Sequence, residues 1–116
     1  MAIIGRDALL AGFLPEKVVT LPSGAGDVRV RGLTRWEAVE LARRVDAGEL
    51  TGPEAEVGAI PVGMLEPKLS EDDVREWRRT ALAADLQAVA EAISSLSNMD
   101  EGAGKGPTSS SRSRRT

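Results

Sequence analysis

The stretch from Ser70 to Met99 constrains the fold more than any other part of the chain. Its apolar residues recur at steps of three and four, the spacing of one face of an α-helix. The residues of this stripe are Val74, Trp77, Ala81, Leu82, Leu86, Val89, Ile93 and Leu96. Ser70 is a good N-cap, and the acidic residues 71–73 put negative charge in the first turn, where the helix dipole favours it. The pattern predicts one continuous helix over residues 70–99, whose apolar stripe has to pack against something.

Residues 17–32 are predicted to form a β-hairpin. The runs KVVTL and DVRVRGL are rich in β-branched residues, and the second alternates valine with arginine, as in a strand with one buried face. Between them, PSGAG consists of turn-forming residues. A glycine-rich loop of this kind binds phosphate when a helix begins directly after it, but here a second strand follows. The loop is therefore interpreted as a hairpin turn and not as a nucleotide site.

A second helix is predicted over residues 34–47. Thr34 and Glu37 have the spacing of a capping box, and Gly48 ends the run. Trp36 is expected to anchor this helix in the core, because aromatic residues make up only 3% of the chain.

Two segments give weaker signals. Near the N-terminus, Asp7 is expected to cap a short apolar helix, which is too short to be stable unless it docks on another surface. Residues 48–69 are expected to form a connector rich in glycine and proline, with a short helix that Pro61 ends.

Composition excludes most catalytic chemistry. The chain has no cysteine and no histidine, so it lacks thiolate nucleophiles, the commonest general base and the commonest metal ligand. The acidic residues 71–73 do not have the alternating spacing of a calcium loop. We therefore expect no enzymatic activity, no catalytic or metal-binding residue and no cofactor. No apolar run approaches the ~20 residues of a membrane span, and a soluble protein is expected.

Charge divides the chain into a body and a tail. Residues 1–101 contain 11 basic and all 18 acidic residues, a net charge of −7, whereas the remaining four basic residues follow in GAGKGPTSSSRSRRT. Residues 102–116 are expected to be a disordered, basic, serine-rich tail. Because the tail has no aromatic residue to stack on bases and only four positive charges, nucleic-acid binding is not expected.

These signals together predict a single α+β domain over residues 1–101 that is mostly α-helical. The expected architecture is a small N-terminal β-hairpin packed on two or three helices, with a long C-terminal helix and the disordered tail.

The order of these motifs resembles that of the tail assembly chaperones of long-tailed bacteriophages. The resemblance covers roughly residues 18–101, and its most specific parts are LPSGAGDVRVRGLTRWE and EPKLSEDDVREW. It implies a protein that binds the tape measure protein, keeps this long apolar helical partner soluble, and recruits tail tube protein during tail morphogenesis. It also implies action in the host bacterial cytoplasm and absence from the mature virion.

A chaperone of this kind needs an apolar surface that accepts a partner helix. The candidate partner-binding residues are Trp77, Leu82, Leu86, Val89 and Ile93, since a hairpin and a short helix are not expected to cover the whole stripe. Self-association through the same stripe is also expected.

Two other classes of protein stay open. The first is a minor structural virion protein, such as a head–tail connector or a tail component. The second is a small DNA-binding regulator, which the connector of about 20 residues between the two clearest helices disfavours, because a helix-turn-helix has a turn of about 3–4 residues.

Overall fold

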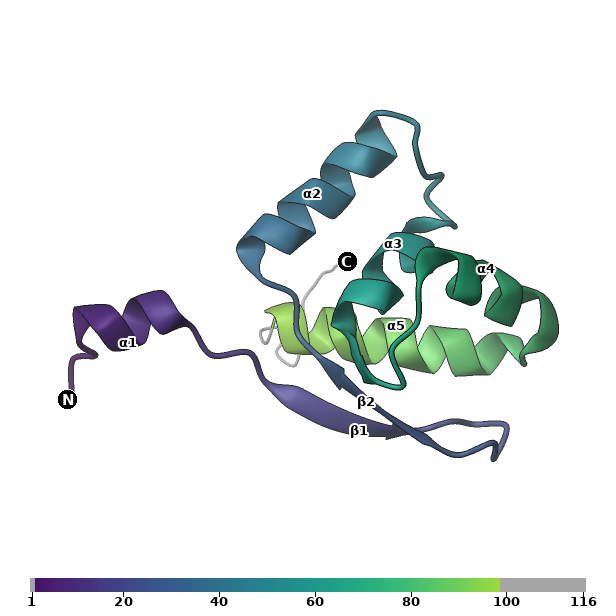
Figure 1. Ribbon diagram of the computed structural model, residues 1–116, viewed down its shortest axis with the longest axis horizontal. Coiled ribbons are helices and arrows are strands. Elements are labelled where there is room, and N and C mark those ends of the chain that lie inside the picture. The colour runs from purple at the N-terminus through teal and green to yellow at the C-terminus, as the bar shows by residue number, and fades with distance from the viewer. Residues whose placement is uncertain (1, 99–116) are drawn as a thin grey trace, which may run out of the picture.

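The computed structural model describes residues 2–98, which form five helices and three strands (Figure 1). In chain order they are α1 (Arg6–Ala11), β1 (Glu16–Thr20), β2 (Asp27–Arg31), α2 (Arg35–Asp46), α3 (Ala55–Gly63), β3 (Met64–Glu66), α4 (Glu71–Thr80) and α5 (Ala83–Asn98). The protein is α+β and mostly α-helical, as the sequence predicts. In the view of Figure 1, β1 and β2 lie below α5, and α3 and α4 lie above it. Helix α1 extends away from the rest.

The predicted hairpin is confirmed. Strands β1 and β2 pair antiparallel with Val19 opposite Val28, and the valines that face α5 are buried. Gly24 and Gly26 lie in the connecting turn with φ of 87° and 151°, a backbone conformation that residues with a side chain rarely adopt. The strand that follows the turn, and not a helix, gives the glycine-rich loop its role as a hairpin tip.

The second predicted helix is also present, but it packs through a different face. The Thr34 side chain accepts a hydrogen bond from the Glu37 N–H and the Glu37 carboxylate accepts one from the Thr34 N–H, which completes the capping box that begins α2. Trp36 does not anchor the core as predicted: it is 76% exposed. Leu41 and Val45 pack against the core instead, because α3 approaches α2 on that side.

The predicted connector contains the expected short helix, which runs further than predicted, and a strand that was not predicted. Helix α3 continues through Pro61 instead of ending there, and β3 follows it and pairs antiparallel with β2. Pro61 lies only two residues before the helix end, so it removes a single helical hydrogen bond, and the fully buried Val57 and Ile60 hold the turns before it against the core. The segment is thus the centre of the core and not a connector.

The prediction of one helix over residues 70–99 is wrong. The helical stretch breaks at Ala81, whose backbone is extended, and α4 and α5 are separate helices. The Ser70 capping box begins α4 as predicted. Breaking the stretch allows both helices to contact α3 while α5 also packs under β1 and β2, which a straight rod cannot do.

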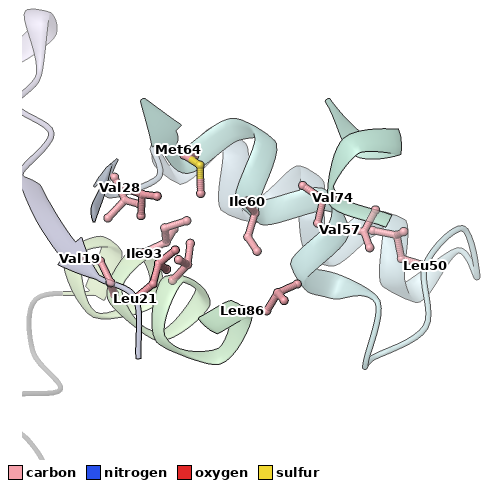
Figure 2. Close-up of a cluster of buried hydrophobic side chains, with 13 residues drawn as sticks. Val19, Leu21, Val28, Leu50, Val57, Ile60, Met64, Val74, Leu86 and Ile93 are labelled. Carbon is pink, nitrogen blue, oxygen red and sulfur yellow. The ribbon is translucent and has the colours of Figure 1, made fainter. Parts of the chain in front are cut away.

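The core draws on every element except α1 and α2, which have no buried residue of their own (Figure 2). Its largest fully buried side chains are Leu50, Ile60, Met64, Ile93, Val30, Val57, Val74 and Val89. The predicted disordered tail, residues 102–116, lies outside the described residues. Among residues 2–98, no helix has the length and apolarity needed to cross a membrane.

Candidate partner-binding surface

The five predicted partner-binding residues occupy three different environments. Leu86, Val89 and Ile93 are between 0% and 4% exposed and belong to the core, so the expectation that they form an open stripe is wrong. The hairpin and α3 together cover this part of α5. The short helix expected before Pro61 was not predicted to pack on α5, so this cover was not expected from the sequence. Leu82 lies in the break between α4 and α5 and is 53% exposed. Trp77 is half-buried and faces a groove.

This apolar groove has a volume of about 490 Å³ and lies between the hairpin, the chain following β3, and α4. Its lining residues are Leu21, Val28, Met64, Pro67, Leu69, Asp73, Glu76, Trp77 and Thr80. The floor is formed by buried apolar side chains of the sheet, and the α4 side adds the two carboxylates. The groove therefore presents an apolar surface with an acidic border, which suits an apolar segment that carries basic residues at its edge.

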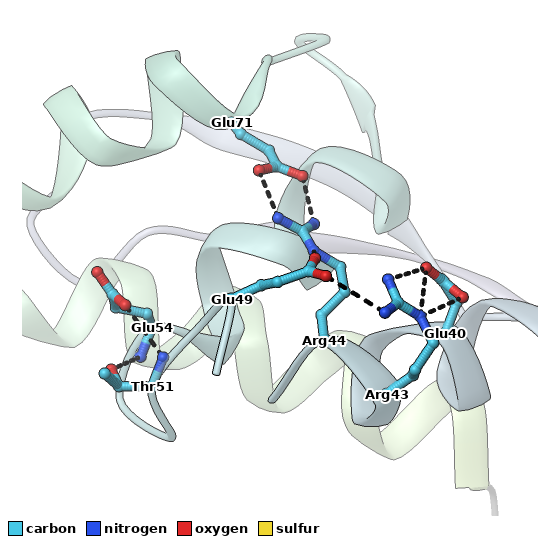
Figure 3. A network of polar contacts seen from close by, with 7 residues as sticks. All are labelled: Glu40, Arg43, Arg44, Glu49, Thr51, Glu54 and Glu71. Carbon is cyan, nitrogen blue, oxygen red and sulfur yellow. Dashed lines mark hydrogen bonds and ion pairs between the residues drawn. The ribbon is translucent and has the colours of Figure 1, made fainter. Parts of the chain in front are cut away.

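Helix α4 forms one wall of the groove and is held by ion pairs on its other side. Glu71 at its first turn accepts two hydrogen bonds from the Arg44 guanidinium of α2, at 2.6 and 3.1 Å (Figure 3). Further along α4, Arg78 pairs with Glu56 of α3 at 2.8 Å. These contacts fix α4 relative to α2 and α3, so the position of Trp77 is set by the fold.

The carboxylates of this network are suited to ion pairing and not to acid–base catalysis. The hydrogen bonds from Arg44 lower the pKa of Glu71, and those from Arg43 lower the pKa of Glu40. Figure 3 shows both arginines at the end of α2, with Glu49 also in contact with them. A carboxyl group that acts as a general acid near neutral pH requires a raised pKa. The pKa values of Glu71 and Glu40 are lowered instead, as expected of carboxylates in structural ion pairs.

The one charged residue that is buried among residues 2–98 is Asp85, which is 3% exposed. Its carboxylate accepts hydrogen bonds from the Ser23 backbone N–H at 2.9 Å and from the Ser23 hydroxyl at 2.6 Å. Asp85 also lies in the first turn of α5, where the helix dipole favours negative charge. These contacts attach the hairpin tip, and with it the groove residue Leu21, to α5.

Two further apolar surfaces are exposed. The first is the N-terminal segment, defined here as residues 3–14, whose large apolar side chains point away from the core: Ile3, Ile4, Leu9, Leu10, Phe13 and Leu14. The second is the outer face of α2, with Trp36 and Val39. The only signal for the first surface in the sequence is that its helix is too short to be stable unless it docks on another surface.

Among the described residues, no group of three or more acidic side chains lies in an arrangement that could hold a metal ion. No protein-family model, curated protein or solved structure matches the chain.

Proposed function

We propose that this protein is a tail assembly chaperone of a long-tailed bacteriophage. In this role it binds the tape measure protein, keeps it soluble in the host bacterial cytoplasm and recruits tail tube protein, without being part of the mature virion. The proposal rests on the sequence resemblance and on the place of the resembling residues in the fold.

The observation that carries the proposal is that the two most specific segments of the resemblance meet at the apolar groove. Leu21 and Val28 come from LPSGAGDVRVRGLTRWE, and five more lining residues come from EPKLSEDDVREW. Those five are Pro67, Leu69, Asp73, Glu76 and Trp77. Segments that are distant in sequence thus build one surface, as expected if the resemblance reflects a shared binding site.

The groove has the chemistry that such a partner requires. An amphipathic helix binds a groove by inserting apolar side chains at steps of three and four, and Trp77 offers a large contact area at the wall. Basic residues flanking the apolar side of the helix would meet Asp73 and Glu76 at the border. A body with a net charge of −7 over residues 1–101 helps to keep such a complex in solution.

The test is co-expression with an apolar helical fragment of the tape measure protein from the same phage. We expect wild type to keep the fragment soluble, and Trp77→Ala and Glu76→Lys each to reduce the soluble complex at least several-fold. Trp36→Ala is the matched control, because Trp36 is exposed on α2 outside the groove. Far-UV circular dichroism and the urea midpoint verify that each variant is folded.

Equal recovery of the fragment with wild type and both groove variants would exclude the groove as the binding site. Detection of the chain in purified phage particles by mass spectrometry would contradict the chaperone role and would favour the minor structural virion protein instead.

A further inference from the structure

Strand β1 has one open edge. The sheet order is β1-β2-β3, so among residues 2–98 no strand pairs with the other side of β1. The Leu21 N–H donates to the Gly26 carbonyl, and the Pro15 carbonyl accepts from the Gly32 N–H, so odd-numbered residues of this strand point their backbone groups toward β2. Since these directions alternate, Glu16, Val18 and Thr20 point theirs outward. These groups can form a further strand pair.

A second groove, the edge groove, lies directly below this open edge. It has a volume of about 430 Å³ and is lined by Lys17, Val18, Val19, Thr20, Ala88, Glu91, Ala92 and Ser95. The α5 residues of this wall, apart from Glu91, are small. Val18, on the outer face of the same strand, is 58% exposed. The edge groove is thus a surface of mixed polarity, formed by α5 beside the unpaired edge of β1.

We propose that a second copy of this chain pairs with this edge, antiparallel, with Val18 of one copy opposite Val18 of the other. The outward-pointing residues then match each other: Glu16 of one copy faces Thr20 of the other, and about six backbone hydrogen bonds form across the two-fold axis. The two sheets become one continuous sheet of six strands. This inference is independent of the proposed function, because it uses a different surface from the apolar groove.

The helix layer fits this arrangement. Helix α5 packs under both β1 and β2, and we take its axis to run between them, about half a strand spacing inside β1. With strands about 4.8 Å apart, the two α5 axes come within about 10 Å of each other, near the upper end of ordinary helix packing distances. At this distance the helices can pack without a clash, because Ala88, Ala92 and Ser95, which line that side of α5, are small.

The charges of the edge groove are complementary under the same symmetry. Lys17 points toward the helix layer, and among residues 2–98 it makes no ion pair. An inward-pointing lysine on an edge strand ordinarily opposes strand pairing. In the dimer each Lys17 projects over the seam between the two α5 helices, and Glu91 of each copy lines the same seam, so the two lysines and two carboxylates can pair around the two-fold axis.

Charge reversal with rescue tests this pairing. Analytical ultracentrifugation of the full chain should give a species of twice the 12.3 kDa chain mass. Lys17→Glu and Glu91→Lys should each weaken dimerisation at least tenfold, and the double variant should restore it. Val18→Pro should also give monomers, because it removes an outward N–H that the protomer does not use. Asp46→Lys is the control, since Asp46 is exposed on α2, away from the edge.

A wild-type chain that stays monomeric at millimolar concentration would overturn the proposal. So would a dimer or larger oligomer that Val18→Pro leaves intact, or charge-reversal variants whose combination restores nothing. Circular dichroism separates these outcomes from misfolding, and Lys17 and Glu91 are exposed in the protomer, so their replacement leaves the core unchanged.

Discussion

At the scale of single residues, buried glycines decide how closely the helices approach. A Cβ atom added to Gly63 would lie 2.7 Å from Cδ1 of Ile93 and 2.9 Å from its Cγ2. Ile93 is itself fully buried and cannot move aside. We therefore expect Gly63→Ala to lower the free energy of unfolding by about 1–3 kcal/mol, measured by urea denaturation, even though alanine is the better helix former.

Gly52 provides the matched control for this substitution. No atom lies within 4 Å of the position that its Cβ would occupy, and its φ is not in the left-handed region. Gly52→Ala should change the free energy of unfolding by less than about 0.5 kcal/mol. If both variants unfold at the same urea concentration, close packing at Gly63 is not what stabilises the contact between α3 and α5.

A second residue-scale prediction concerns the ion pair between Arg31 of β2 and Glu37 of α2. The Arg31 guanidinium donates two hydrogen bonds to Glu37, at 2.9 and 3.0 Å, and these lower the pKa of Glu37. A carboxylate with a lowered pKa in the folded state stabilises the protein above its unfolded pKa, near 4.5. This stabilisation is lost as the pH falls through the lower, folded value.

Glu37→Gln should therefore cost about 1 kcal/mol of unfolding free energy at pH 7, and this cost should shrink as the pH falls through the lowered pKa of folded Glu37, because the wild-type side chain then loses its charge too. Glutamine keeps an acceptor for the Thr34 N–H, so the substitution isolates the charge. Urea denaturation of both proteins at several pH values measures this difference. A gap that stays constant with pH would mean that the charge of Glu37 does not contribute.

At the scale of elements, the ones predicted from the sequence are those whose signals are local. The hairpin follows from alternating valines and turn residues, and the start of α2 follows from Thr34 and Glu37. The missed features depend on contacts distant in sequence. No glycine or proline marks the break at Ala81, and burial against the sheet and α5 carries α3 through Pro61. One local signal for the break was available: Asp85, an acidic residue inside an apolar stripe.

The attachment of the hairpin to α5 gives the element-scale prediction. Ser23→Ala removes the hydroxyl that donates to the buried Asp85 carboxylate, leaving only the backbone N–H. Because a buried charge that loses a donor is costly, we expect a loss of about 1–3 kcal/mol of unfolding free energy. Amide exchange at the hairpin tip should also accelerate, since the tip is then held less firmly to α5.

Ser94→Ala is the control for this change, because Ser94 is an exposed serine of α5. Its effect on stability should be within about 0.5 kcal/mol of zero. If Ser23→Ala behaves like Ser94→Ala in both stability and amide exchange, the contact with Asp85 does not hold the hairpin tip.

At the scale of the whole molecule, the candidate site could be predicted only in part. Trp77 was identified from its place on the apolar stripe, and it does line the apolar groove. Leu86, Val89 and Ile93 belong to the same stripe but are buried, because helical periodicity reports an apolar face without reporting what covers it. The groove itself combines residues from three separate parts of the chain, which no periodicity within one segment could bring together.

The N-terminal segment exposes large apolar side chains and is not expected to contribute to the stability of the fold. Helix α1 has no buried residue, and Phe13 after it is 87% exposed, so the segment contributes no packing to the folded core. Deleting residues 2–13 should therefore change the free energy of unfolding by less than about 0.5 kcal/mol. The same deletion removes most of an exposed apolar surface that is unfavourable in water, so binding of an apolar fluorescent dye should fall markedly.

Urea denaturation and dye titration of the full chain and the deleted chain measure these two effects separately. A deleted chain that loses stability would mean that the segment packs on the body, and unchanged dye binding would place the main exposed apolar surface elsewhere, at the apolar groove or at Trp36.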